Sequence, residues 1–257
     1  MTGARRRTQR LVAATILVPA AAVVLAGCGA VGGGARDDTL QVLAAASLTD
    51  AFTELGERFE AEHDGVEVQF SFGSSTDLAE QAADGAPGDV LATADEAAME
   101  IAGAAGAVVD PVVFATNTLV IVTPPGNPAA VRSLGDLAGA TWVRCADEVP
   151  CGRAARALLD DAGVGARPAS LEEDARATLD KVVSGEAEAA LVYATDAASA
   201  GDAVTAVEVP GADGERNAYL MAPLAQAGDA ELAVEWADFV TGPEGGSVLT
   251  AAGFSRP

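Results

Sequence analysis

The chain has 257 residues, of which half are hydrophobic, and its formal net charge at pH 7 is −23. Only 15 residues are basic against 38 that are acidic, a balance that argues against nucleic acids and anionic membrane surfaces as partners. An anion could bind only where backbone N–H groups, hydroxyls and helix N-termini create a local donor site.

The first 27 residues have the pattern of a secretory signal peptide. Four arginines precede an apolar run over residues 11–25, which is too short, and too disrupted by Pro19, to favour a membrane-spanning anchor. The sequence Leu25-Ala26-Gly27-Cys28 then resembles the lipobox of bacterial lipoproteins, which implies a lipid on Cys28. We therefore predict a flexible glycine-rich tether over residues 28–38 and a protein lipid-anchored to the extracytoplasmic face of the cell membrane.

After the tether, short strand-like runs alternate with helical patterns. Apolar runs and period-two alternation predict strands at residues 41–45, 66–72, 89–93, 119–122, 141–144, 189–193, 204–209 and 219–221. Apolar residues at helical spacing predict helices from residue 48 and over residues 76–83, 95–102, 152–162, 175–184, 230–240 and 243–252. This alternation predicts an α/β fold with mainly parallel sheets, in which ligands bind at the carboxyl ends of the strands.

Two of the predicted strands lead into a serine at the start of a helix. Strand 41–45 is followed by Ser47, and strand 66–72 is followed by Ser74 and Ser75. A serine in this position commonly caps its own helix by accepting from the first N–H groups. If the two strands are neighbours, their hydroxyls and free N–H groups instead converge on one spot with the positive potential of helix ends. Capping and anion binding are both compatible with the sequence.

Six segments, taken in order, resemble those of periplasmic molybdate-binding proteins. They are residues 44–51, 72–81, 85–90 with 94–95, 117–122, 149–152 and 191–197. The resemblance covers residues 40–254 and implies a type II periplasmic-binding-protein fold of two lobes. Each lobe would be a mainly parallel sheet flanked by helices, with the ligand in the cleft between them. Lobe one would comprise residues 39–116 plus 216–257, and lobe two residues 117–215.

The resemblance also implies a ligand site of uncharged donors. Ser47 and Ser75 would donate hydroxyl and backbone N–H groups from lobe one. Cys151 and Ala175 would donate backbone N–H groups at the starts of two helices, and Tyr193 would donate its phenol. The chain departs from the family pattern at Cys151, where alanine is common, and at Ala175, where valine is common. Both positions would act through the backbone, so the departures leave the binding role intact.

The function implied is capture of molybdate or tungstate by a monomeric, non-enzymatic receptor that delivers it to the permease of an ABC importer. Molybdenum would enter only as the bound oxyanion, and no cofactor is expected. A general base is not apparent, since the single histidine, His63, lies in an acidic, surface-like run. A receptor for another tetrahedral oxyanion, such as sulfate, is the main alternative. A ferric-ion receptor is disfavoured because the chain has no adjacent tyrosines.

An alternative of a different class is a secreted thiol oxidoreductase using Cys145 and Cys151. Their C-x5-C spacing differs from the redox motif C-x-x-C, which disfavours it. These are the two cysteines that remain if Cys28 carries lipid, and export would place both in an oxidising compartment. We therefore expect a disulfide between Cys145 and Cys151, which would pre-order the N–H of Cys151 for binding.

Overall fold

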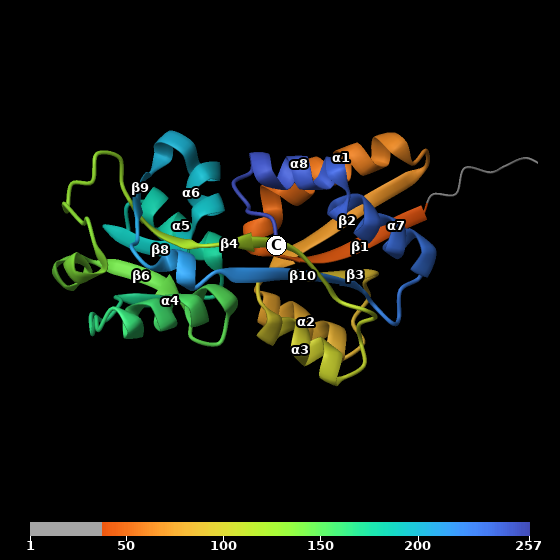
Figure 1. The fold of residues 1–257 in the computed structure, drawn as a ribbon, viewed down its shortest axis with the longest axis horizontal. Helices are drawn as coiled ribbons and strands as arrows, with labels where there is room; N and C mark the ends of the chain where they lie inside the picture. Colours follow the sequence, from red (N-terminus) through yellow and green to blue (C-terminus); the bar gives the residue numbers. More distant parts are fainter. Residues whose placement is uncertain (1–37) are drawn as a thin grey trace, which may run out of the picture. The chain divides into compact units, whose positions relative to one another are not determined.

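The computed structural model describes residues 38–257 (Figure 1). The predicted signal peptide, the lipidated Cys28 and the predicted tether up to residue 37 lie outside the described residues. Asp38, which we assigned to the tether, is instead the first residue of strand β1. Within the described part, none of the helices combines the length and the apolar character needed to cross a membrane.

The first sheet has five strands in the order β2-β1-β3-β10-β4. Strands β1 (Asp38–Ala45), β2 (Val66–Gly73) and β3 (Val90–Thr93) are parallel to one another. Strand β10 (Asn217–Pro223) runs antiparallel to both β3 and β4 (Val112–Asn117). The helices around this sheet are α1 (Thr49–Glu62), α2 (Ser75–Ala83), α3 (Glu96–Ala104), α7 (Ala230–Thr241) and α8 (Pro243–Ala251). In Figure 1, α1 and α8 lie on one side of it and α2 and α3 on the other.

The second sheet has the order β7-β6-β8-β5-β9 and repeats this plan. Strands β6 (Trp142–Cys145), β7 (Ser170–Glu172) and β8 (Ala189–Tyr193) are parallel. Strand β5 (Leu119–Thr123) runs antiparallel to β8 and to β9 (Thr205–Glu208). Its helices are α4 (Pro150–Asp161), α5 (Ala175–Val183) and α6 (Ala194–Ala200). Short 3₁₀ helices complete the described part: η1 (Ala46–Leu48), η2 (Leu134–Gly139), η3 (Gly201–Ala203) and η4 (Ala212–Gly214).

Both sheets are mixed, whereas we predicted mainly parallel sheets. In each sheet two strand pairs are parallel and two are antiparallel. The antiparallel pairs all involve β10 or β5, which lie next to the points where the chain passes from one sheet to the other. The α/β alternation predicts parallel pairing only for strands joined by a helical crossover. Within the described part, no α-helix directly precedes β5 or β10 in the chain, since β5 follows β4 directly and β10 follows β9 after a short 3₁₀ helix.

Besides the short 3₁₀ helices, the sequence pattern missed two strands and one α-helix. Strand β4 begins with two half-exposed valines, β7 has only three residues, and α6 contains no large apolar side chain. Each of these segments lacks the sustained apolar period on which the prediction rested.

The chain passes between the sheets twice, once from β4 into β5 and once from β9 to β10. At these crossings Asn117 of β4 lies directly opposite Asn217 of β10. We propose that the two crossings separate the lobes predicted from the sequence.

Packing of α1 against its neighbours in the first sheet's layer fixes where β1 ends and α1 begins. On α1 the buried positions are Ala51, Phe52, Leu55, Gly56 and Phe59, which share one helix face. The rings of Phe52 and Phe59 both meet Trp236 of α7 edge to face, with centroids 5.8 and 5.3 Å apart. Burial of each large side chain contributes about 1.5–3 kcal/mol, so this cluster holds the β1–α1 turn in place.

Candidate functional site

A small cavity lies where helix starts from the two sheets meet. Its volume, ≈ 10 Å³, is about what one water molecule requires, so its walls lie close together. The residues around it are Ala45, Ala46, Ser47, Gly73, Ser74, Ser75, Ala94, Val149, Pro150, Cys151, Asp174, Ala175 and Tyr193. The structure thus brings together all five of the predicted ligand residues: Ser47, Ser75, Cys151, Ala175 and Tyr193. None of the lining residues is basic.

The first sheet contributes Ser47 and Ser75, which follow the paired ends of β1 and β2. Helix α2 is capped by Ser74, whose hydroxyl accepts from the N–H of Asp77 at 3.4 Å. Ser75 instead accepts from the N–H of Ala94 at 3.0 Å, and Ser47 caps neither η1 nor α1. Capping therefore explains Ser74 but not the two predicted ligand serines.

The second sheet contributes two helix N-termini. Helix α4 begins at Pro150, which has no N–H, so Cys151 presents the first backbone donor of the helix. Helix α5 begins at Ala175, behind Asp174, whose carboxylate accepts from the N–H of Ala177 at 2.8 Å. The first N–H groups of a helix have no partner within it, and their dipoles add to a partial positive charge.

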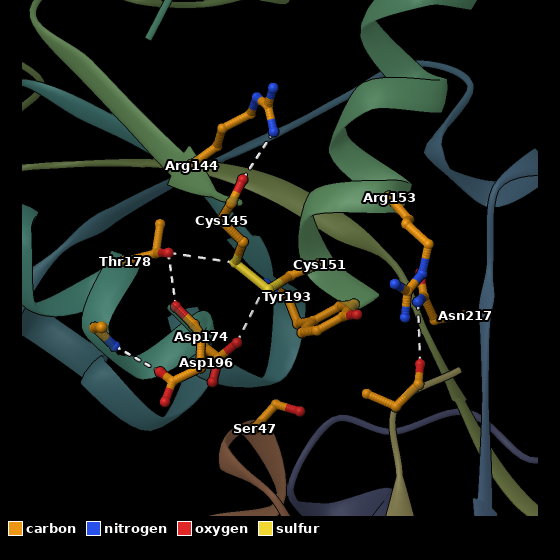
Figure 2. Close-up of a disulfide and its surroundings, with 12 residues drawn as sticks. Ser47, Arg144, Cys145, Cys151, Arg153, Asp174, Thr178, Tyr193, Asp196 and Asn217 are labelled. Carbon is orange, nitrogen blue, oxygen red and sulfur yellow. Dashed lines mark hydrogen bonds between the residues drawn. A yellow bond between two sulfur atoms is a disulfide. The ribbon is translucent and has the colours of Figure 1, made fainter. Parts of the chain in front are cut away.

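A disulfide joins Cys145, at the end of β6, to Cys151 in the first turn of α4, with their Cα atoms 5.7 Å apart (Figure 2). The bond closes the five-residue loop from 146 to 150 beside the cavity. Gly152 makes this turn possible, because a Cβ there would lie 1.6 Å from the carbonyl oxygen of Ala146. No side chain can be added at Gly152 without moving the backbone that presents the Cys151 N–H.

Tyr193 supplies a hydroxyl that is buried and has no hydrogen-bond partner among the described residues. Burial holds the pKa of this phenol well above its usual value, so the group remains a donor. An unpaired buried hydroxyl costs about 1–3 kcal/mol. A ligand that brings an acceptor into the cavity would remove that cost.

Two ion pairs connect the helices of the two sheets on either side of the cavity. Arg153 of α4 binds Asp95, the N-cap of α3, through two contacts: Nε to Oδ2 at 2.7 Å and an Nη to Oδ1 at 3.0 Å. Arg176 of α5 binds Asp50 of α1, and its Nε lies 3.4 Å from Asp196. A cation in the first turn of a helix opposes the helix dipole. Both arginines occupy such positions, where their partners from the first sheet offset this cost.

Asp196 is fully buried in the first turn of α6, where one carboxylate oxygen accepts from the N–H of Tyr193 at 3.2 Å. Burial raises the pKa of Asp196 to about 7, although Arg176 and the Tyr193 N–H act in the opposite direction. The group therefore titrates near neutral pH beside the cavity.

The sequence prediction missed the ion-pair residues and Tyr219, whose hydroxyl lies 2.8 Å from Ser47 Oγ. Ser47 and Ser75 could be found because a serine after a strand is a local signal. The family resemblance alone indicated Cys151, Ala175 and Tyr193. Arg153, Arg176 and Tyr219 act through partners distant in sequence, and no local pattern identifies those partners.

Comparison with known proteins matches residues 40–255 to the family model described as bacterial extracellular solute-binding protein. The chain belongs to that family of solute-binding proteins. The molybdate-binding protein ModA of Mycobacterium tuberculosis is 43% identical to it over 87% of this chain and 86% of the relative. This relative supports the resemblance on which the sequence prediction rested.

Solved structures share the fold of this solute-binding protein. The periplasmic molybdate-binding protein of Azotobacter vinelandii superimposes with a TM-score of 0.76 at 22% identity, covering 85% of this chain and 99% of that one. The sulfate-binding protein SubI of Mycobacterium tuberculosis gives 0.75 at 20% identity, covering 85% and 87%. The predicted type II periplasmic-binding-protein fold is confirmed, with mixed sheets in place of mainly parallel ones.

Replacing Tyr193 with phenylalanine is expected to stabilise the ligand-free solute-binding protein. The change removes an unpaired buried hydroxyl, so the free energy of unfolding should rise by about 1 kcal/mol. Tyr219→Phe is the matched control, because its hydroxyl is hydrogen-bonded and its loss should lower stability. Urea denaturation measures both; a fall of equal size in the two variants would contradict the assignment of Tyr193 as unpaired.

Asp196 should make the stability of this solute-binding protein depend on pH. Its folded pKa of about 7 exceeds the unfolded value of 3.8, so between these values the folded state binds more protons. The free energy of unfolding should therefore fall as pH rises from 4 to 7, by roughly 4 kcal/mol at most. Urea denaturation at pH 4 and pH 8 should show this fall in the parent and in the exposed control Asp160→Asn, but a smaller one in Asp196→Asn.

Proposed function

We propose that this solute-binding protein captures molybdate or tungstate outside the cytoplasm and delivers it to an ABC importer. The observation that carries the proposal is the convergence of five uncharged donors, predicted from six ordered motifs, on one small cavity. The name of its 43% identical relative in Mycobacterium tuberculosis, a molybdate-binding protein, supports the same ligand.

The chemistry of the cavity suits a small tetrahedral oxyanion. Such an ion offers only acceptors, and the hydroxyls of Ser47, Ser75 and Tyr193 with the N–H groups of Cys151 and Ala175 can all donate. The N-termini of α4 and α5 add positive potential without formal charge. A dianion can thus be bound inside a protein whose net charge is strongly negative.

We propose that the protein binds without catalysing a reaction. His63 directly follows α1 and is not among the residues that line the cavity. Its ring stacks on Phe59, with centroids 3.9 Å apart, and its Nε2 lies 3.8 Å from Glu235 of α7. Cys145 and Cys151 are both buried and joined to each other, which disfavours the thiol oxidoreductase considered above.

Sulfate is the second candidate ligand, since a cage of neutral donors accepts any tetrahedral dianion. The structural similarity to a sulfate-binding protein favours keeping this candidate.

We propose that the protein works as a monomer, held by a lipid on Cys28 to the extracytoplasmic face of the membrane, and that its protein partner is the importer permease.

Calorimetric titration of the purified protein tests the ligand. We expect tight binding of molybdate and tungstate and little heat from sulfate or phosphate. Molybdate, tungstate and sulfate are tetrahedral dianions that differ in size, so their ranking reports on the size of the occupied cavity, whereas phosphate is partly protonated near neutral pH and also brings a hydroxyl donor. Equal or tighter binding of sulfate would assign the protein to the second candidate.

Loss of either serine hydroxyl should weaken binding. Ser47→Ala and Ser75→Ala each remove a hydrogen bond to a charged group, which contributes about 1.5–3 kcal/mol, so the Kd should rise about ten- to a hundredfold. The exposed Ser133→Ala serves as control, because its hydroxyl contacts only Asp136. Unchanged affinity in both cavity variants would contradict a ligand role for these serines.

We propose that the two lobes close on the bound anion and that the ion pair between Arg153 and Asp95 favours the closed arrangement. Arg153→Gln removes a partly exposed, bidentate contact worth about 1 kcal/mol, so molybdate should dissociate about fivefold faster. Stopped-flow release measures this rate, and small-angle scattering should show a larger radius of gyration without ligand. The control is Arg156→Gln on the same helix, since Arg156 pairs only with Asp147 and Asp160 of the second sheet's segment. Equal rates in the two variants would exclude a role in closure.

A further inference from the structure

Tyr219 of β10 is fully buried next to the cavity without lining it. Its hydroxyl lies 2.8 Å from Ser47 Oγ and accepts a longer hydrogen bond, of 3.4 Å, from Asn117 Nδ2. Asn117 belongs to β4, the strand that pairs with β10 in the first sheet (Figure 1). The hydroxyl of a proposed ligand residue is thus the end of a hydrogen-bonded chain that starts in the crossing strands.

The orientation of the Asn117 amide follows from its other contacts. Its Oδ1 accepts from the N–H of Thr118 at 3.0 Å, so the nitrogen must face the other way. That nitrogen donates to Thr195 Oγ1 at 2.8 Å as well as to Tyr219. An amide NH₂ group can only donate, and the Tyr219 oxygen therefore acts as acceptor towards Asn117.

The direction of the next bond follows from the ligand. Ser47 has one hydroxyl hydrogen, and an oxyanion offers only acceptors, so Ser47 must direct that hydrogen to the anion. The contact between Ser47 and Tyr219 can then be a hydrogen bond only if Tyr219 is the donor. Burial raises the pKa of the Tyr219 phenol, which keeps the required hydrogen in place.

We propose that Tyr219 is a positioning residue for anion binding, donating to Ser47 so that the Ser47 hydrogen is turned into the cavity. This inference rests on the proposed function. Hydrogen bonds aligned in one direction, from Asn117 through Tyr219 to Ser47, polarise one another and strengthen the last donor. Without Tyr219, the Ser47 hydroxyl is free to rotate, and part of the binding free energy is lost in ordering it.

The same series of hydrogen bonds connects the two sheets. Thr195 lies in α6, two residues after Tyr193, whereas Ser47 follows β1 of the first sheet. Asn117 donates both to Thr195 of the second sheet's helix α6 and to Tyr219 of the first sheet. The orientation of the Ser47 hydroxyl therefore depends on the arrangement of the crossing strands. Anion binding and the geometry of the crossing are thereby coupled.

The test is a double-mutant cycle measured by calorimetry with molybdate. Tyr219→Phe keeps the ring, which packs edge to face against Phe114 and Phe254, and removes only the hydroxyl. We expect the Kd to rise about five- to tenfold in this variant. Because Tyr219 acts through Ser47, adding Tyr219→Phe to Ser47→Ala should cause no further loss.

A buried hydroxyl elsewhere provides the control. Thr123 is fully buried on β5 and donates to Pro124 and Thr205 carbonyls, so Thr123→Val should leave the Kd unchanged. Should Tyr219→Phe fail to fold, as judged by circular dichroism, Asn117→Ala removes the preceding donor. It should raise the Kd about threefold, and only where Ser47 is present.

The outcomes separate this inference from the proposed function. If the parent binds molybdate and Tyr219→Phe binds it equally well, the positioning role is wrong and the receptor function stands. The same holds if the affinity lost in Tyr219→Phe adds fully to the affinity lost in Ser47→Ala. If the parent binds sulfate in place of molybdate, the same cycle with sulfate decides the role of Tyr219. If the parent binds none of molybdate, tungstate, sulfate and phosphate, both proposals fall.

Discussion

The cavity of this protein depends on unsatisfied backbone and hydroxyl donors held in a fixed arrangement without a formal positive charge. The first residues of helices α4 and α5 and the turns after β1 and β2 all lie at the cavity. Free donors at a helix start would normally bind water. Here they are buried, and the unpartnered hydroxyl of Tyr193 shows that the protein itself does not satisfy all of them. An acceptor that entered the cavity could therefore satisfy the proposed donors.

Apart from Asp174, whose carboxylate caps α5, the charged groups named above lie outside the cavity lining. Arg153 and Arg176 stand one or two residues after the predicted N–H donors Cys151 and Ala175, yet both turn to aspartates from the other sheet. The charges thus hold the walls together while the inner contacts stay uncharged. This separation matters in an acidic protein, since a free arginine inside the cavity would attract the protein's own carboxylates as readily as a ligand.

Backbone geometry sets the remaining constraint. The loop from 146 to 150 is closed by the Cys145–Cys151 bond and passes so near α4 that Gly152 has no room for a Cβ. On the opposite wall, the Phe52, Phe59 and Trp236 cluster fixes the start of α1 and with it Ser47. Donor placement therefore depends on packing outside the cavity and on a disulfide at its edge.

The sequence by itself determined the α/β class, most strands and helices, and the five candidate donors, because strand-to-helix junctions and family motifs are local signals carried by consecutive residues. It did not determine that β10 and β5 run antiparallel to their neighbours, since strand direction depends on how the chain returns between sheets. Only the tertiary structure decided that the Ser74 hydroxyl caps α2 while that of Ser75 bonds to Ala94, and that Tyr219, far along the chain, reaches Ser47. These contacts join residues distant in sequence, and their partners are chosen by the packing of whole elements.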